Sequence, residues 1–260
     1  DEIADVLRAH ATDDTAGFVI TGYGTRAFSA GADIGRFPDL LGDAEAAAEY
    51  ARACSRLLIY LDQIEQPVVA ALNGMALGGG LELAMRCHAI VAVPDAWMQF
   101  PEITLGIVPG IGGMVVPYRR WPQAANTFHA MLRQARRLPA AEAHGLGIID
   151  AMAGDYAGMI ETAVRLVRDV EVSSRRPVDG AIDIPALAPA EALAENGQRL
   201  SRQITGLIDD AIRDAGACTS YADGLEVGYR AFGASACTRA AREGIDAFMN
   251  NRRPDFAKTG

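Results

Sequence analysis

Residues 73–82 read Asn73-Gly74-Met75-Ala76-Leu77-Gly78-Gly79-Gly80-Leu81-Glu82. The apolar run at residues 67–74 is typical of a buried strand, and residues 81–86 suit a helix. A strand that ends in a glycine triplet and leads into a helix places backbone N–H groups at the positive end of the helix dipole. No Lys-Ser/Thr pair follows the glycines and they form no G-x-G-x-x-G, which argues against nucleotide-phosphate and Rossmann sites. The open alternative is that the glycines only permit close helix packing, with Glu82 as a favourable first-turn charge.

On both sides of this segment, strand-like and helix-like patterns alternate. Residues 17–22 and 89–93 predict strands, the first of them a buried one bounded by glycines, and residues 43–61 predict a helix. Such alternation indicates an α/β fold. After Pro139 the strand signals fade, and the patterns at residues 140–146, 159–170, 190–213, 221–232 and 238–250 predict helices. We therefore expect an α/β core at residues 1–176, a linker or irregular loop at 177–189, and a C-terminal helical subdomain at 190–260.

The composition restricts the class of protein. A chain of 260 residues with 50% hydrophobic content can bury a large core. The net charge of −9 argues against a nucleic-acid partner, because phosphate neutralisation needs clustered Lys and Arg. No apolar stretch has the length of a membrane span, and the start lacks the features of a signal peptide, so a cytoplasmic location is the expectation. The four cysteines form no C-x-x-C, which disfavours metal or redox use.

Two further segments carry candidate chemistry. Residues 28–34, Phe-Ser-Ala-Gly-Ala-Asp-Ile, are mostly small, and the N–H groups of such a loop can point at one acceptor. The alternative is an ordinary tight turn. Glu102 precedes an apolar, glycine-punctuated turn, where a carboxylate is partly desolvated, as suits a group that carries a proton; the alternative is an exposed surface glutamate. Glutamates beside turns that expose amides suggest enolate chemistry, in which carboxylates move protons while N–H groups hold developing negative charge.

In order and spacing, three motifs resemble the enoyl-CoA hydratase/isomerase, or crotonase, superfamily. They are F-S-A-G-A-D, then N-G-x-A-x-G-G-G-x-E-L-A, then P-E-x-x-L-G-x-x-P-G-x-G-G. The likeness continues through residues 137–150 and 242–248, covers most of residues 1–172, and resumes near 221–255. It implies a crotonase-like spiral of ββα units with a C-terminal helical subdomain.

The resemblance also implies a site for an acyl-CoA substrate. The N–H groups of Ala32 and Gly79 correspond to the oxyanion hole, and Glu82 and Glu102 to the two catalytic glutamates of hydratases; isomerases commonly retain only the later one. The residues expected to bind the substrate are Ser29, Ala30, Gly31, Asp33, Ile34, Gly78, Pro109 and Gly110. The implied activity is that of an enoyl-CoA hydratase. The alternatives are an isomerase, another crotonase-type acyl-CoA lyase or hydrolase, and a non-catalytic acyl-CoA-binding scaffold.

Several expectations concern cofactors, assembly and departures from the family pattern. The resemblance implies no metal and no cofactor beyond the coenzyme A of the substrate, and a homotrimer or a dimer of trimers. The chain opens at the family's first helix, so the expected strand hairpin before it is missing: it was truncated or cleaved, or it belongs to an upstream peptide or a longer fusion with a dehydrogenase domain. Residues 114–119 replace the family's T-Q-R continuation, and residues 178–198 look like an insertion, so the preferred acyl chain is not predicted.

Overall fold

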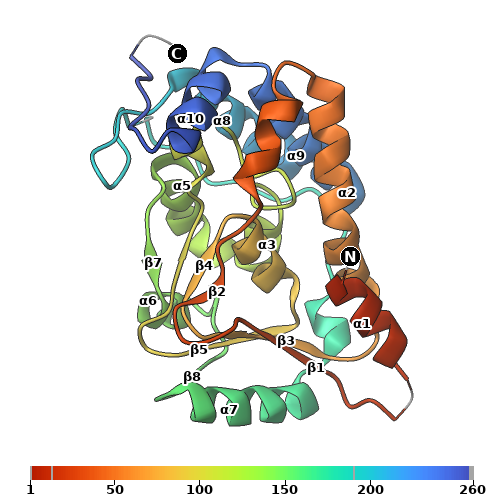
Figure 1. The fold of residues 1–260 in the computed structure, drawn as a ribbon. Helices are drawn as coiled ribbons and strands as arrows, with labels where there is room; N and C mark the ends of the chain where they lie inside the picture. Colours follow the sequence, from red (N-terminus) through yellow and green to blue (C-terminus); the bar gives the residue numbers. More distant parts are fainter. Residues whose placement is uncertain (1, 13, 190, 258–260) are drawn as a thin grey trace. The chain divides into compact units, whose positions relative to one another are not determined.

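The computed structural model describes residues 2–12, 14–189 and 191–257 (Figure 1). The chain packs into two compact units. Unit 1 consists of Asp1–Gly31, Ser55–Met98 and Leu138–Pro177, and unit 2 of Ala32–Cys54, Gln99–Arg137 and Val178–Gly260. Asp1, Asp13, Ala190 and residues 258–260, which belong to the predicted ranges 1–176 and 190–260, lie outside the described residues.

The described part of unit 1 contains two four-stranded sheets. The first has the order β1-β3-β5-β8 and is parallel throughout; in the second, β2-β4-β6-β7, β2 and β4 are parallel whereas β6 and β7 are antiparallel. The strands are β1 (Phe18–Thr21), β2 (Ala27–Ser29), β3 (Val68–Leu72), β4 (Met75–Leu77), β5 (Ala89–Ala92), β6 (Trp97–Gln99), β7 (Leu138–Pro139) and β8 (Ala151–Met152). Consecutive strands enter first one sheet and then the other, and a helix follows in β1-β2-α2 and β3-β4-α3. This is the predicted ββα spiral.

The helices of unit 1 are α1 (Glu2–His10), α3 (Gly79–Arg86), α6 (Ala140–Gly145), α7 (Tyr156–Asp169) and η4 (Val172–Arg175), and α2 (Ala44–Gln63) begins in unit 2 and ends here. Among them, α7 covers the first sheet and α3 carries part of the predicted site. Helix α7 lies across one face of the β1-β3-β5-β8 sheet (Figure 1). Its residues Met159 and Ala163 belong to one buried cluster with Val69 and Val91. Because β3 and β5 are buried along their whole length, they need the continuous apolar sequence that predicted them.

Strand β1 differs from its prediction. The sequence indicates a buried strand at residues 17–22, but every residue of β1 is only half-buried. The reason is its place at the end of the sheet order, where β1 pairs with β3. An apolar run bounded by glycines does not distinguish a central strand from one at the edge.

Unit 2 is built from helices. They are η1 (Ile34–Leu40), η2 (Glu102–Leu105), α4 (Val116–Arg120), η3 (Pro122–Ala124), α5 (Ala125–Gln134), α8 (Arg202–Ala217), α9 (Tyr221–Ala236) and α10 (Arg239–Met249). Local capping explains three helix starts, because the side chains of Ser201, Ser220 and Thr238 accept hydrogen bonds from backbone N–H groups of the first turn. The predicted helices at 221–232 and 238–250 are confirmed.

The helix predicted at residues 190–213 is wrong in its first half. Helix α8 begins only at Arg202, and Leu193 and Arg199 instead form an antiparallel bridge. The turn of this small hairpin contains Gly197 with φ 77°. Turn chemistry and the Ser201 cap therefore outweigh the apolar spacing on which the prediction rested. Residues 177–189 contain no helix or strand, as expected for an irregular loop. Among the described residues, none of the helices has the length and apolar character to cross a membrane.

Candidate active site

The predicted site residues are divided between the two units. Unit 1 contains Gly79 and Glu82, and unit 2 contains Ala32 and Glu102.

In unit 1, the loop after β2 lies against the start of α3. A Cβ at Gly80 would lie 2.4 Å from the Cβ and Oγ of Ser29. Likewise, a Cβ at Gly31 would lie 2.9 Å from the Leu77 carbonyl oxygen and 3.5 Å from the Gly79 nitrogen. The structure thus brings Ser29 and Gly31 together with Gly79, and glycines are required because the two backbones approach so closely.

The loop itself is ordered by a local hydrogen bond. The Gly31 N–H donates to Ser29 Oγ over 3.3 Å, and Gly31 has φ 92°, in the region that favours glycine. Ala30, between them, is exposed. Gly31 is the last residue of this segment of unit 1, and Ala32, which follows it, is the first residue of unit 2.

Helix α3 begins without a side-chain cap. Its N-cap is Gly78, with φ 48° and ψ −124°, and the first-turn N–H groups of an α-helix have no acceptor within the helix. The Glu82 N–H donates to the Gly78 carbonyl over 2.9 Å, and the Glu82 side chain is buried, with the residue 4% exposed. A buried carboxylate in the first turn lies where the helix dipole stabilises negative charge. This end of unit 1 therefore combines a glycine turn with a carboxylate that is shielded from water.

In unit 2, the segment after the loop forms η1. Ala32 and Asp33 are exposed, and Ile34 is half-buried. Asp33 is the N-cap of η1: its Oδ1 accepts a hydrogen bond from the Gly35 N–H over 2.9 Å. The capping role of this predicted substrate-binding residue escaped the sequence analysis, although an Asp two residues before a Gly is a common turn signal.

A tyrosine that the sequence analysis did not single out lies near this turn. The ring of Tyr50 in α2 contacts Phe37 edge to face, with ring centroids 6.0 Å apart. Burial, followed by the neighbouring Cys54, raises the pKa of Tyr50 to about 12. Its hydroxyl therefore stays protonated near neutral pH.

Glu102 is the first residue of η2 and is half-buried, while the next residue, Ile103, is fully buried. This turn packs backbone to backbone on α10. A Cβ at Gly244 would lie 2.0 Å from the Leu105 carbonyl oxygen, and one at Gly106 would lie 2.3 Å from the Ala240 carbonyl oxygen. The position of Glu102 thus depends on glycines whose role becomes visible only in the packed unit.

Pro109 and Gly110 are both buried in unit 2. A Cβ at Gly110 would lie 2.7 Å from the Cβ of Phe232, so this turn packs tightly on α9. The prediction that these residues bind substrate remains a prediction. The observed contact of Gly110 is with α9 of the same unit.

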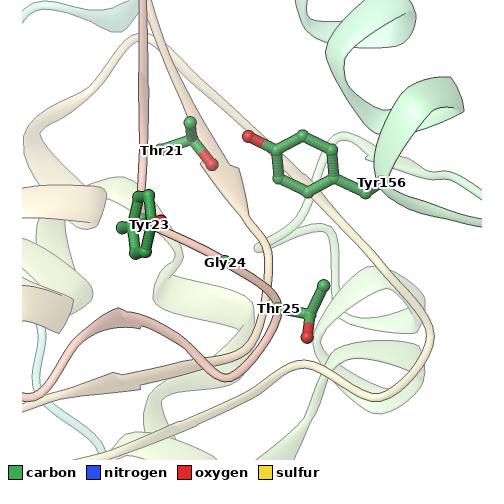
Figure 2. A pocket seen from close by; sticks show the side chains of 6 residues that line it. Thr21, Tyr23, Gly24, Thr25 and Tyr156 are labelled. Carbon is green, nitrogen blue, oxygen red and sulfur yellow. The ribbon is translucent and has the colours of Figure 1, made fainter.

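Unit 1 also has an open pocket at the carboxyl end of β1, with a volume of about 600 Å³. Its lining residues are Thr21, Gly22, Tyr23, Gly24, Thr25 and Tyr156 (Figure 2). In this view the Tyr156 hydroxyl points towards Thr21. None of these six residues carries a carboxylate, so the lining offers no acid–base pair for proton transfer at a carbon atom.

Comparisons with known proteins concern the family of the chain. The family model described as enoyl-CoA hydratase/isomerase matches residues 1–184. A probable enoyl-CoA hydratase of Bacillus subtilis is 31% identical over 259 residues, covering 98% of this chain and 87% of the relative. A crotonyl-CoA hydratase of Syntrophomonas wolfei is 30% identical over 260 residues, covering 98% of this chain and 86% of the relative.

A solved structure supports the same fold. The crystal structure of an enoyl-CoA hydratase from Rhodobacter sphaeroides aligns with a TM-score of 0.70 at 21% identity, covering 98% of this chain and 82% of that one. At this identity the likeness concerns the fold alone. The family match, the identity to the relatives and the ββα architecture lead to one conclusion: the chain belongs to the enoyl-CoA hydratase/isomerase family of crotonase-type enzymes.

Proposed function

We propose that this protein is an enoyl-CoA hydratase that adds water reversibly across the double bond of a 2-enoyl-CoA thioester. The observation that carries the proposal is the contact of the 29–31 loop with the glycine turn that starts α3, together with the buried Glu82 in the same helix. Backbone amides beside a shielded carboxylate are what a reaction through an enolate needs. Retention of a glutamate at both family positions, 82 and 102, supports hydration.

In the proposed reaction, the N–H groups of Ala32 and Gly79 donate to the thioester carbonyl oxygen. Glu82 orients the water and takes its proton as the oxygen bonds to Cβ. The electron pair of the double bond moves to form the enolate, and Glu102 delivers a proton to Cα. Each amide donor is worth ~3 kcal/mol in a site of this kind. The reverse sequence eliminates water, and neither direction uses a metal or a nicotinamide.

The remaining predicted contacts belong to this proposal. Coenzyme A would run along residues 29–34, with Gly78, Pro109 and Gly110 completing the substrate contacts. Because the relative from S. wolfei is named a crotonyl-CoA hydratase, crotonyl-CoA is the first substrate to test, followed by enoyl-CoA thioesters of increasing chain length.

The decisive experiment replaces each glutamate by the isosteric amide. We expect Glu82→Gln and Glu102→Gln each to lower the hydration rate by ~10²–10⁴-fold, because the amide keeps the size and cannot exchange the proton. Binding of the acyl-CoA should remain nearly intact. Glu102→Gln should also suppress exchange of the α-proton with solvent. Loss of the enoyl-thioester absorbance measures hydration, and deuterium uptake measures α-exchange.

Two exposed glutamates provide controls. Glu161 lies on α7 of unit 1 and Glu191 lies in unit 2, and changing either to Gln should leave both rates unchanged. If Glu82→Gln kept full hydration activity while Glu102→Gln abolished double-bond migration, the proposed activity would be that of an isomerase and not of a hydratase. Wild-type protein that binds acyl-CoA without turnover would indicate a scaffold.

A further inference from the structure

The 3-10 turn that carries Glu102 receives a hydrogen bond from a distant side chain. Within the turn itself, the Glu102 carbonyl accepts from the Ile107 N–H and the Ile103 carbonyl accepts from the Gly106 N–H, each over 3.2 Å. The Thr104 carbonyl instead accepts from Gln198 Nε2 over 2.7 Å. Gln198 lies 94 residues further along the chain, in unit 2 like the turn.

Gln198 belongs to the small hairpin that precedes α8, and its backbone is held on both sides. Its carbonyl accepts from the Ala194 N–H over 2.8 Å, and its own N–H donates to Asn196 Oδ1 over 2.9 Å. Two apolar residues of the hairpin, Ala194 and Leu200, are buried, with exposed fractions of 5% and 4%. The side-chain amide therefore starts from a fixed backbone and loses little freedom when it reaches Thr104.

The hairpin is also fastened to α5 independently of the Glu102 turn. The Glu195 N–H donates to the Gln134 carbonyl over 2.9 Å, and Glu195 Oε2 accepts from the Arg137 N–H over 2.7 Å. These two bonds lie at the C-terminal end of α5, Ala125–Gln134. The hairpin can thus act as a fixed support for the turn.

We propose that Gln198 is a positioning residue for Glu102: its amide holds the carbonyl end of η2 and thereby fixes the direction of the glutamate at the start of the turn. The inference rests on the proposed function, in which Glu102 delivers the α-proton. A carbonyl can only accept, so the group facing Thr104 has to be a donor. Glutamate has the same length as glutamine, but its ionised carboxylate is an acceptor and would face the Thr104 carbonyl oxygen, which is also an acceptor.

The test compares Gln198→Glu and Gln198→Met with a matched control, Gln203→Glu. Gln203 is exposed on α8 in the same unit. Neither the ionised carboxylate nor the thioether can donate to Thr104. We expect amide hydrogen exchange across residues 102–107 to become faster in both Gln198 variants and not in the control. We also expect kcat for hydration to fall by about tenfold with KM within about twofold, because one partly buried hydrogen bond is lost from the turn.

The pH profile separates positioning from a general loss of fold. Protonation turns the introduced carboxyl into a donor, so the kcat of Gln198→Glu relative to wild type should recover as the pH falls, whereas that of Gln198→Met should not. Urea unfolding of each variant measures whether the fold is kept. Unchanged amide exchange at residues 102–107 and unchanged kcat in both Gln198 variants would overturn the inference.

Failure of the proposed function is distinguishable from failure of this inference. If wild-type protein neither hydrates enoyl-CoA thioesters nor exchanges an α-proton, the hydratase proposal fails. Faster amide exchange in the Gln198 variants would then still support the inference that Gln198 fixes the η2 turn. Unchanged amide exchange would overturn that inference too.

Discussion

At the scale of single residues, burial determines the protonation states of Tyr118 and His129 in unit 2. The Tyr118 hydroxyl lies 2.8 Å from His129 Nδ1, and both side chains are buried. Burial raises the pKa of Tyr118, so its hydroxyl keeps its proton near neutral pH. Burial is also the largest cause that lowers the pKa of His129, while a backbone hydrogen bond at Pro185 acts in the opposite direction. His129 is therefore neutral in the folded protein near neutral pH.

Because the pKa of His129 is lowered in the folded protein, we predict a loss of stability in mild acid. In the unfolded chain a histidine takes up its proton near pH 6.5, whereas the folded protein resists protonation of His129 to lower pH. Between these two values the unfolded state binds more protons, so the free energy of unfolding falls as the pH falls, by up to ~1.4 kcal/mol per pH unit. Urea unfolding between pH 7.5 and 5 should show this slope.

The variant His129→Gln tests the assignment, because glutamine can form a hydrogen bond with Tyr118 and does not titrate. It should reduce the dependence of stability on pH in this window. His144→Gln, on the exposed side of α6, should leave the dependence as in wild type. Equal pH slopes for His129→Gln and wild type would show that another group is responsible.

At the scale of elements, glycines decide how closely two segments approach. The η2 turn and α10 meet where the Leu105 carbonyl oxygen lies over Gly244. Within α8, by contrast, Gly206 has no heavy atom within 4 Å of the position its Cβ would take, apart from its sequence neighbours and the helix's own backbone. The same residue type is thus required for packing in α10 and carries only an entropic cost in α8.

Opposite outcomes follow for two alanine substitutions. Gly244→Ala places a methyl group 2.0 Å from a backbone oxygen, so it should lower the free energy of unfolding by ~1–3 kcal/mol and reduce the proposed hydration by displacing Glu102. Gly206→Ala should raise the stability by ~0.5–1 kcal/mol, because alanine restricts the unfolded chain. Urea unfolding and the absorbance assay measure the two effects. A fully stable and active Gly244→Ala protein would show that η2 adjusts without cost.

At the scale of the whole molecule, we propose assembly into a trimer or a dimer of trimers, as the family resemblance implies. Helix α10 leaves Phe248 and Met249 each 50% exposed, which is unfavourable for apolar side chains in water. Light scattering on purified protein should give three or six times the chain mass of 27.5 kDa. The double change Phe248→Glu and Met249→Glu should lower the mass at micromolar concentration, whereas Val178→Glu, in the irregular loop, should not. A stable monomer of the wild-type chain would contradict the proposal.

The sequence by itself determined the kinds of element and their order. Apolar runs predicted β3 and β5, and helical spacing predicted α2, α7, α9 and α10, because burial periodicity and end caps such as Ser220 and Thr238 are local properties of the chain. The order of the three motifs also determined the family. Even so, local patterns could not separate an edge strand from a central one, nor the hairpin before α8 from a longer helix.

Only the tertiary structure decided which distant groups meet. The contacts of Gly80 with Ser29, of Gly244 with Leu105 and of Gln198 with Thr104 join residues that are far apart in the sequence. No propensity or motif encodes such a pair, because the pair forms only when whole elements pack together. In the packed protein each buried backbone polar group needs a hydrogen-bond partner, and two backbones can approach closely only where the side chains between them are small. For this reason both glutamates can be read from the motifs, whereas the side chains and glycines that hold the Glu102 turn cannot.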